Sequence, residues 1–503
     1  MNHPTPTPPI DPEAEPLATL KERISTPPRP STSGQALLTD LYQLTMSEVY
    51  YACGHTKSAV FELFVRRLPK NRNYLICAGL DPILDYLEDF AFSAEEIDWI
   101  RRCGHFDDDF AHRLADLRFT GDVHAMPEGT PFFENEPVIR ITAPLPEAQL
   151  VESRLINLFH IQTLIASKAA RIVNCAQGKT LVDFGFRRAH GAEAGVLAAR
   201  AAYLAGFEGS ATVEAGKRLG IPLYGTMAHS FIQIYPREID AFLDFARVRP
   251  DRITLLVDTY ELQSGVVEAA DAARQLRRRG VTVGAIRIDS GDLESASRTA
   301  RRILDARGCK DVKIFLSGSL DEYRIESLIE ADCPVDGFGV GTRLNVSDDA
   351  PSIDCVYKLQ EYAGRASRKR SPNKTTLPGR KQVWRRFDEQ GRIASDIVGL
   401  ESDPIEGEAL LMPVMRKGRR LAAPPSLDES RRRCLAGYRS LPEPLLSLDE
   451  SERIPVEIAP SIHEAAQRID NEHRAAPIPN DPMSPPIEID GGQGSDSQRR
   501  AVG

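Results

Sequence analysis

Residues 223–344 contain a repeating pattern that decides the fold. Short apolar runs recur in this stretch, and each ends in small or polar residues: LYGTMAHS (223–230), TLLVDTY (254–260), AIRIDSGD (285–292), KIFLSGS (313–319) and GFGVGTR (337–343). Apolar runs bounded by Gly, Ser and Asp predict buried parallel strands. Helical patterns at 265–279 and 293–307 lie between them, and the repeat of about 24 to 33 residues is the length of a βα unit.

The polar residues stand at the carboxyl end of each predicted strand. A barrel of βα units places its active site at this end, so the pattern is typical of an enzyme. A further short strand, TLVDFG (180–185), starts the series. We predict an irregular TIM-like α/β barrel over 150–364. A second α+β domain is expected from 35–149, completed by about 365–425.

Composition excludes several classes of protein. The net charge of −9 over 503 residues argues against a nucleic-acid binder, which needs a basic field to meet phosphates. A basic cluster at 365–386 suits a small phosphorylated ligand instead. No run approaches the roughly 20 apolar residues that span a bilayer, and no signal peptide opens the chain, so we expect no membrane partner and a cytoplasmic location. The eight cysteines lack metal-like spacing, which predicts free thiols in a reducing compartment.

Both ends of the chain differ from the middle. Residues 1–34 are rich in Pro among Thr, Ser and Glu, and residues 473–503 are rich in Pro, Gly, Ser and Asp. Such segments bury too little apolar surface to offset their ordering entropy, so we predict a disordered arm and a disordered tail. A C-terminal helical segment is predicted at 426–472.

A long helix is predicted before the strand series, because apolar residues recur at helical spacing over 150–173. Its polar residues Ser167, Lys168 and Arg171 are expected on a solvated or lining face.

Two glycine-containing runs follow the last two predicted strands and are the candidates for binding phosphate. Ser319 with Glu322 has the spacing of a capping box, and a Gly-x-Gly run is usually a turn, so each signal alone is weak. Two such runs on one edge of a barrel, where phosphate sites commonly lie, are more persuasive. The candidate residues are Ser317, Gly318, Ser319, Gly339, Gly341 and Thr342.

Charged residues at the strand ends are the candidates for chemistry. Arg287 and Asp289 are two apart on one strand and point to the same face, either as a structural ion pair or as ligands of phosphate and ribose hydroxyls. His229 is either a satisfied packing residue or a neutral nucleophile facing Asp289, and its position favours the nucleophile. Asp258 and Asp292 suit metal contacts or helix caps.

Together the motifs resemble those of nicotinate phosphoribosyltransferase. The resemblance covers 37 to about 469 and rests on LTDLYQ (38–43), DFGFRRA (183–189), GTMAHS (225–230), IRIDSGD (286–292) and the loop at 338–342. It implies an enzyme of NAD biosynthesis that joins nicotinate to phosphoribosyl pyrophosphate (PRPP), releases pyrophosphate and couples this reaction to ATP hydrolysis. It also implies Mg²⁺ as cofactor, ATP and PRPP as co-substrates, and a homodimer with active sites at the subunit interface.

The resemblance implies a pocket for the pyridine ring. Phe184 would stack on one face, and Tyr42 from a second subunit would cover the other. Arg187 would neutralise the nicotinate carboxylate. In the run GSATV (209–213), Ser210 and Thr212 would contact substrate.

The resemblance also implies roles around the sugar and its phosphates. His229 is similar to the histidine that ATP phosphorylates transiently, and Arg287 and Asp289 would hold the ribose. The two glycine-containing runs would cradle the 5′-phosphate. Weaker candidates for pyrophosphate contacts are Arg66, Arg67, Asp258, Lys358, Lys369 and Lys374.

Position 211 favours nicotinate over nicotinamide. The nicotinamide-using relative has an aspartate in a GTDTV run close to its base, whereas this chain has Ala211. A carboxylate there would repel that of nicotinate by on the order of 4 kcal/mol at about 4 Å in a partly buried site.

Two alternatives remain open. Quinolinate phosphoribosyltransferase would need a denser basic pocket, a decarboxylation and no ATP-linked histidine. A catalytically silent family member would serve as a binding or regulatory protein. The chain departs from the family pattern at FHIQT (159–163) and at His190, and it lacks the Asp-Asp PRPP loop of the Rossmann-like phosphoribosyltransferases, which agrees with a barrel.

Overall fold

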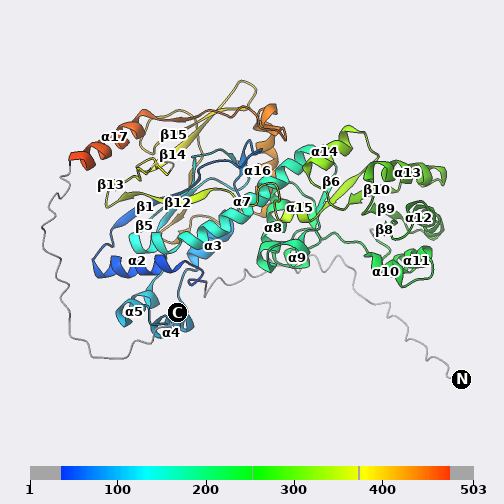
Figure 1. The fold of residues 1–503 in the computed structure, drawn as a ribbon, viewed down its shortest axis with the longest axis horizontal. Coiled ribbons are helices and arrows are strands. Elements are labelled where there is room, and N and C mark those ends of the chain that lie inside the picture. Colours follow the sequence, from blue (N-terminus) through cyan, green and yellow to red (C-terminus); the bar gives the residue numbers. More distant parts are fainter. Residues whose placement is uncertain (1–34, 252, 372–373, 476–503) are drawn as a thin grey trace.

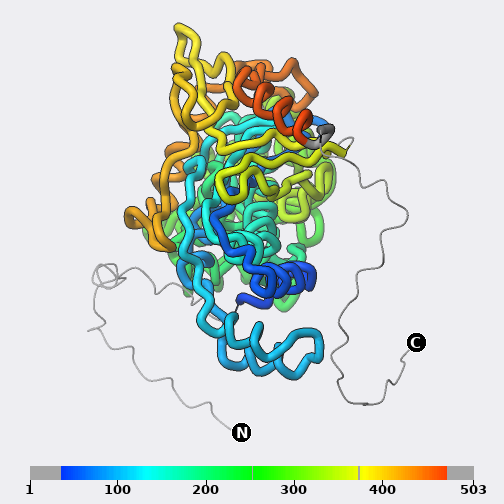
Figure 2. The backbone as a smooth tube through the Cα atoms, turned by 90° about the vertical axis from the view of Figure 1, so that its left-hand side faces the viewer, coloured from blue at the N-terminus to red at the C-terminus, as the bar shows by residue number. Residues whose placement is uncertain are grey.

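The computed structural model describes residues 35–251, 253–371 and 374–475. The predicted arm at 1–34 lies outside these residues, and so does the predicted tail from 476 onward. The last described helix, α17 (Pro460–Ala475), extends into the predicted tail, so the C-terminal helical segment is slightly longer than expected. In Figures 1 and 2, α17 lies beside β15 (Ile393–Leu400), which precedes it by about sixty residues in the chain.

The predicted strand series forms one parallel sheet of six strands, in the order β7-β6-β11-β10-β9-β8. These strands are β6 (Thr180–Asp183), β7 (Gly209–Ser210), β8 (Ile253–Leu256), β9 (Val283–Ile288), β10 (Lys313–Ser317) and β11 (Gly337–Val340). The first strand along the chain, β6, pairs with the last, β11, with Leu181 opposite Phe338. Pairing of first with last is the connection that closes a barrel. The sheet is therefore curled in the manner of a barrel.

The curl is interrupted between β7 and β8, where the predicted strand at 223–230 is wrong. Only Leu223 makes a bridge, to Ser210, and His229 begins the short helix α10 (His229–Gln233). Pro222 and Gly225 flank a run of only two apolar residues, and both of these remain partly exposed, so little burial supports a strand here. The structure is a parallel sheet curled over part of a barrel rather than a complete one.

Helices cover the outer side of the parallel sheet, as the βα repeat predicted. They are α8 (Ala192–Ala205), α9 (Val213–Leu219), α11 (Glu238–Val248), α12 (Leu262–Arg277), α13 (Leu293–Ala306) and α14 (Glu322–Glu330). In α13 the buried residues are Leu293, Ala296, Ser297, Ala300 and Leu304, which is the stripe of an amphipathic helix. Asp292 starts this helix by accepting a hydrogen bond from the backbone N–H of Glu294. Figure 1 shows α11, α12 and α13 side by side.

A seven-stranded sheet interleaves the N-terminal segment with the segment that follows the parallel sheet. Its order is β13-β12-β1-β5-β3-β17-β18. The strands are β1 (Ser58–Val65), β3 (Asp122–Ala125), β5 (Pro137–Pro144), β12 (Cys355–Tyr362), β13 (Arg365–Ala366), β17 (Met412–Arg416) and β18 (Arg419–Arg420). Strands β1 and β12 pair in antiparallel fashion. The sequence predicted that about 365–425 would complete the N-terminal domain, whereas β12 lies before that range, inside the segment predicted for the barrel.

Smaller elements complete this half of the molecule. A four-stranded sheet has the order β16-β14-β15-β19, with β14 (Lys381–Phe387), β16 (Glu408–Ala409) and β19 (Val456–Ile458), and β2 (Leu75–Ile76) pairs with β4 (Pro131–Phe132). The helices are α2 (Leu41–Ala52), α3 (Leu80–Glu88), α4 (Ala94–Arg102), α5 (Asp108–Asp116), α6 (Leu145–Leu150) and α16 (Leu427–Ser440). Short 3-10 helices lie at η1 (Phe186–Arg188) and η2 (Glu443–Leu446).

The long helix α7 (Glu152–Cys175) joins the two halves and is buried on nearly all sides. Leu155 and Leu158 pack in the core of the antiparallel sheet, whereas Ile165 and Ala169 pack in the core of the parallel sheet. Figure 1 shows α7 crossing the middle of the molecule. Of the two predicted faces, solvated or lining, the solvated one is wrong, because Ser167, Lys168 and Arg171 are all buried.

All eight cysteines are free thiols. Across the described ranges, no helix combines the length and the apolar character needed to cross a membrane.

A buried carboxyl group makes the stability of this fold depend on pH. Glu136, just before β5, is fully buried next to Asp396 and Arg385, and its Oε2 accepts a hydrogen bond from the backbone N–H of Phe133 at 2.9 Å. Burial, together with the charge of Asp396, raises the pKa of Glu136 well above its usual range, although Arg385 opposes the shift. The folded chain therefore binds this proton more tightly than the unfolded chain does, so stability falls as the pH rises above about 4.5.

We expect Glu136→Gln to remove this contribution, because an amide keeps the shape and the hydrogen bonds but carries no titrating proton. In urea unfolding, the variant should gain stability relative to the wild type when the pH is raised from about 5 to about 8. Glu389→Gln, in an exposed turn, is the matched control and should show no such gain. If the free energy of unfolding differed between wild type and Glu136→Gln by the same amount at both pH values, the expectation would be contradicted.

Candidate active site

The carboxyl ends of β6, β8, β9, β10 and β11 form one edge of the parallel sheet, here called the carboxyl edge, and Arg287 lies at its centre. The guanidinium donates three short hydrogen bonds: Nε to Ser317 Oγ at 2.8 Å, Nη1 to Thr226 Oγ1 at 2.9 Å and Nη2 to Asp289 Oδ1 at 2.7 Å. The prediction that Arg287 and Asp289 share a face is confirmed. One cation therefore joins the end of its own strand to the end of β10 and to the loop before α10.

Asp289 is held as a carboxylate next to this cation. Its Oδ1 also accepts a hydrogen bond from Ser317 Oγ at 2.5 Å. Partial burial raises the pKa of Asp289, but the hydrogen bond from Ser317 and the charge of Arg287 outweigh burial, so the pKa lies below its usual range. The group is ionised at neutral pH and can accept hydrogen bonds from hydroxyl groups of a ligand.

Asp258, at the end of β8, fixes the backbone of the neighbouring loop. Its Oδ2 accepts hydrogen bonds from the backbone N–H of Asp289 at 2.8 Å and from Ser290 Oγ at 2.7 Å. Its Oδ1 is buried and has no hydrogen-bond partner among the described residues. Asp292, the other candidate for metal binding or capping, caps α13.

His229 lies between a hydroxyl group and a carboxylate. Nδ1 is 3.1 Å from Thr259 Oγ1, and Nε2 is 3.7 Å from Asp289 Oδ2. The imidazole side chain is 40% exposed, so a solvent-borne ligand can reach it. A histidine that is oriented by a carboxylate and remains accessible is suited to act as a nucleophile.

Phe184 follows β6 and presents an aromatic face beside the charged residues. The guanidinium carbon of Arg287 lies 5.5 Å from the centroid of its ring, and the ring of Phe315 lies 6.2 Å away. A Cβ at position 339 would come within 2.3 Å of the Phe184 ring, so this position must be glycine for the ring to lie where it does. Gly339, predicted as a phosphate ligand, also makes room for Phe184.

The two runs predicted to bind phosphate are neighbours, because Ser317 of β10 pairs with Gly339 of β11. Gly318 has φ +96°, and a Cβ there would lie 2.1 Å from the carbonyl oxygen of Asp289. The predicted capping box is wrong: α14 is capped by Asp321, whose side chain accepts a hydrogen bond from the backbone N–H of Arg324, while Ser319 adopts a left-handed backbone before it. Gly341 and Thr342 begin the short helix α15 (Thr342–Asn345).

Ser210 and Thr212 are buried and support the site from behind. Ser210 Oγ donates to Asp183 Oδ2 at 2.7 Å, and the backbone N–H of Thr212 donates to Ser210 Oγ at 2.9 Å. Asn345 Nδ2 donates to Asp183 Oδ1 at 2.8 Å. Burial raises the pKa of Asp183, and these donors oppose the shift. Sequence reasoning missed Asp183, although a carboxylate at the end of the apolar run TLVD signals a buried group that needs partners.

Arg187 and Tyr42 differ in their relation to the carboxyl edge. Arg187 lies on η1, three residues after Phe184; it is exposed, and its guanidinium has no hydrogen-bond or ion-pair partner in the described part of the chain. Tyr42 lies on α2 and is 48% exposed. Figure 1 places α2 and the strands β8 and β9 at opposite ends of the long axis. Among the described residues, no hydrogen bond, ion pair or ring contact joins Tyr42 to Phe184.

The basic candidates for pyrophosphate binding make no hydrogen bond or ion pair with the residues described above at the carboxyl edge. Arg66 pairs with Asp354 at 3.4 Å, and Lys358 pairs with Glu152 at 3.4 Å. Lys369 Nζ donates to Ser371 Oγ at 2.9 Å. The exposed residues Arg67 and Lys374 are the remaining two.

Comparison with known proteins agrees with these motifs. The chain matches two family models: the nicotinate phosphoribosyltransferase (NAPRTase) N-terminal domain over 37–160, and the nicotinate phosphoribosyltransferase (NAPRTase) family over 179–363. It is 46% identical over 417 residues to nicotinate phosphoribosyltransferase pncB2 of Mycobacterium tuberculosis, covering 83% of this chain and 89% of that protein. It is 40% identical over 385 residues to nicotinate phosphoribosyltransferase of Bacillus subtilis, covering 75% and 78% of the two chains.

Solved structures show the same fold. Human nicotinic acid phosphoribosyltransferase superposes with a TM-score of 0.78 at 26% identity, over 86% of this chain and 99% of that one. A nicotinate-nucleotide pyrophosphorylase from Pyrococcus furiosus superposes with a TM-score of 0.67 at 27% identity, over 80% and 95%. The fold alone does not separate these two names, whereas the sequence matches do.

Proposed function

The chain belongs to the nicotinate phosphoribosyltransferase family, and from this premise we propose that it makes nicotinate mononucleotide from nicotinate and PRPP in NAD biosynthesis, by the Preiss-Handler salvage route. The observation that supports this function most directly is the meeting of Phe184, Arg287, Asp289 and His229 at one carboxyl edge. An aromatic face, an ionised carboxylate and an accessible imidazole around a guanidinium suit a planar anionic base and a phosphorylated sugar.

The nicotinate site is proposed around Phe184 and Arg187. The phenyl ring offers a face for stacking on the pyridine, and Gly339 leaves it the necessary room. The unpaired guanidinium of Arg187 can meet the nicotinate carboxylate bidentately. The ring nitrogen must remain free of hydrogen bonds to protein, because its lone pair forms the new bond.

The PRPP site is proposed around Asp289 and the two glycine-containing loops. Asp289 would accept hydrogen bonds from ribose hydroxyls, and the loops at 317–319 and 339–342 would donate backbone N–H groups to the 5′-phosphate. The ring nitrogen then attacks C1 while the bond from C1 to the pyrophosphate oxygen breaks, and the bonding electrons leave with pyrophosphate. Positive charge grows on the sugar, where the carboxylate of Asp289 stabilises it.

Mg²⁺ is proposed to bind together with the pyrophosphate. The described residues include no group of three or more His, Cys, Asp or Glu side chains that could hold a metal ion. Mg²⁺ at such sites uses one or two carboxylates and the substrate phosphates, and the buried, unpartnered Oδ1 of Asp258 beside the backbone of Asp289 fits this donor set. When bound, the cation would neutralise the negative charge that develops on the leaving group.

ATP coupling through His229 is the finer part of the proposal and makes the enzyme ATP-dependent and ligase-like. A ring nitrogen of His229 would attack the terminal phosphorus of ATP, and ADP would leave; water later cleaves the bond between nitrogen and phosphorus. Asp289 at 3.7 Å and Thr259 at 3.1 Å orient the ring for this step.

The active unit is proposed to be a homodimer. Leu38, Leu41, Tyr42 and Val49 are all about half exposed and lie on or just before α2, and exposed apolar residues gathered on one helix suggest a protein partner. A second copy that covers them would place its own Tyr42 against the nicotinate site of the first copy.

The reaction itself is the first test. Wild-type protein mixed with nicotinate, PRPP, Mg²⁺ and ATP should form nicotinate mononucleotide and ADP, and the protein should carry an acid-labile phosphoryl group. We expect His229→Asn to lose this label and to lower ADP release by about a hundredfold or more, because the nucleophile is gone. His463→Asn, at an exposed position of α17, is the control and should keep both the phosphoryl label and the rate of ADP release.

No product from nicotinate would contradict the function. Turnover of quinolinate with release of CO₂ would support the rival enzyme, and binding without turnover would support a silent family member. A label retained in His229→Asn would contradict the phosphohistidine alone.

Ala211 supplies a test of substrate choice. Its backbone N–H donates to the carbonyl oxygen of Asp183 at 2.8 Å, so this exposed residue lies close to Phe184. We expect Ala211→Asp to raise the KM for nicotinate at least about tenfold, through repulsion between two carboxylates. Ala211→Asn has the same size without the charge and should raise this KM much less. Unchanged nicotinate kinetics in Ala211→Asp would remove the argument.

Mixed dimers test the shared active site. Tyr42→Ala and His229→Asn should each lower activity when pure. If Tyr42 acts in the other subunit, an equal mixture after exchange of subunits should recover up to about one quarter of wild-type activity, because half of the dimers contain one intact site. If Tyr42 acts within its own chain, no mixed dimer contains an intact site, and activity would stay low.

A further inference from the structure

A buried network of charged residues lies behind the loops that follow β10 and β11. We propose that Lys168, at its centre, is a positioning residue that sets the spacing of the two loops proposed to bind the 5′-phosphate of PRPP. The inference rests on the proposed function and deepens it. It adds a residue of α7, a helix that contributes no residue to the site described above.

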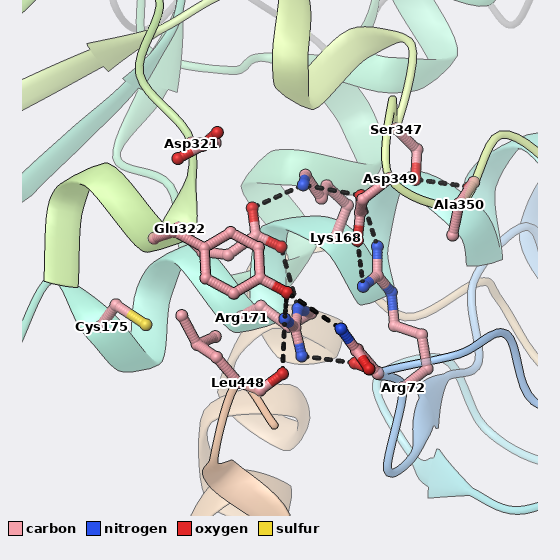
Figure 3. A network of polar contacts seen from close by, with 12 residues as sticks. Arg72, Lys168, Arg171, Cys175, Asp321, Glu322, Ser347, Asp349, Ala350 and Leu448 are labelled. Carbon is pink, nitrogen blue, oxygen red and sulfur yellow. Dashed lines mark hydrogen bonds and ion pairs between the residues drawn. The ribbon is translucent and has the colours of Figure 1, made fainter. Parts of the chain in front are cut away.

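Lys168 joins acidic residues from the start of α14 and from the turn after α15 (Figure 3). Its Nζ lies 2.5 Å from Glu322 Oε2 and 2.7 Å from Asp349 Oδ1, and Asp348 Oδ1 is 3.7 Å away. Lys168 is 1% exposed and Glu322 is completely buried. One ammonium group therefore fixes the distance between two segments that are otherwise separate.

Two arginines extend this arrangement. Arg72 donates Nη1 to Asp349 Oδ2 at 2.6 Å and Nη2 to Oδ1 at 3.0 Å. Arg171, one turn beyond Lys168 on α7, donates Nε to Glu322 Oε1 at 2.9 Å and Nη2 to the carbonyl oxygen of Leu448 at 3.1 Å. Figure 3 shows these side chains converging from α7, from the loop after β1 and from the C-terminal segment.

Each acidic residue lies a short distance from a proposed phosphate-binding loop. Glu322 is the first residue of α14 and follows 317–319 by three positions. Asp349 follows α15, which begins directly after Gly341. The two loops are held side by side in front by the pairing of Ser317 with Gly339, and behind by Lys168. Movement of either acidic residue would therefore change the cradle between them.

Stability alone does not account for this network. Taking charged groups out of water is costly, and apolar residues of similar size often serve a core as well or better. Charged pairs in a core instead favour one geometry over others, because each ion must meet its partners. Although burial raises the pKa of Asp349, Arg72 and Lys168 lower it far below its usual range, so the charge persists at neutral pH. A fixed geometry is what a site for one phosphate group needs.

Another buried lysine provides a matched comparison. Lys381, on β14, is also buried, and its Nζ lies 2.8 Å from Glu62 Oε2 on β1. It also donates to the carbonyl oxygens of Leu377 and Gly379 and touches neither phosphate-binding loop. Loss of Lys381 would disturb a buried ion pair of the same kind in the antiparallel sheet.

The test compares Lys168→Met with Lys381→Met in steady-state kinetics with PRPP and nicotinate varied separately. In Lys168→Met, Glu322 keeps Arg171 and Asp349 keeps Arg72, so no carboxylate is left without a cation. We expect the KM for PRPP to rise about tenfold or more while the KM for nicotinate changes less than about threefold. Lys381→Met should lower the melting temperature and leave both KM values near those of the wild type.

Asp349→Asn is the second variant and covers the case in which Lys168→Met does not fold, since Asp349 is partly exposed. It should raise the KM for PRPP in the same selective way. The double variant, Lys168→Met with Asp349→Asn, should have a KM for PRPP no more than about twofold above that of Lys168→Met, because both changes break the same connection. If the fold-changes of the two single variants in the KM for PRPP multiplied in the double variant, the shared role would be contradicted.

Equilibrium binding of ribose 5-phosphate, measured by calorimetry, decides the inference without turnover. Affinity at least about tenfold lower in Lys168→Met than in Lys381→Met would support it even if the wild type made no nicotinate mononucleotide, an outcome that would overturn only the proposed function. Equal affinity in the two variants, or a proportional rise of both KM values in Lys168→Met, would overturn the positioning role.

Discussion

A guanidinium at the end of a buried strand needs hydrogen-bond acceptors. At Arg287, the groups that accept these hydrogen bonds are residues of the candidate active site, so satisfying the guanidinium brings them together. Ser317 ends β10, Asp289 follows β9 and Thr226 lies in the loop before α10, and each meets one nitrogen of the guanidinium within 3 Å. Because Asp289 is drawn into this cluster, its second oxygen is left facing His229. The accessible imidazole, the ionised carboxylate and the Phe184 ring are arranged around one cation, so most of the local geometry follows from satisfying its charge.

Much of the fold followed from the sequence because parallel strands have a simple signature. Buried runs such as TLLV and KIFL end in polar residues at one edge of the sheet, and this pattern does not depend on the helices that connect them. The strands β8, β9, β10 and β11 and their shared edge were therefore predictable. The segment at 223–230 shows the limit of this signature. Its polar end does contribute Thr226 and His229, but two apolar residues after a proline bury too little to form a strand.

Polar residues inside the fold were the main source of error. Lys168 and Arg171 were predicted on a solvated or lining face because charged residues on helices are usually exposed. Nothing in their spacing reveals carboxylates that lie far away in the chain. Ser210 and Thr212 occupy the predicted run, yet a strand only two residues long buries them behind Asp183. The proposed role of Tyr42 involves a second subunit, which the sequence of one chain does not describe.

The pairing of β1 with β12 has a consequence for how the molecule is made. Strand β1 ends at Val65, and its partner begins at Cys355, after the whole parallel sheet. During synthesis on the ribosome, β1 must therefore wait with one unpaired apolar edge until nearly three hundred further residues have emerged, although β5 can pair with its other edge much earlier. Contacts of such long sequence separation fold slowly, so the nascent chain of this protein is a natural client for chaperones that shield exposed strand edges.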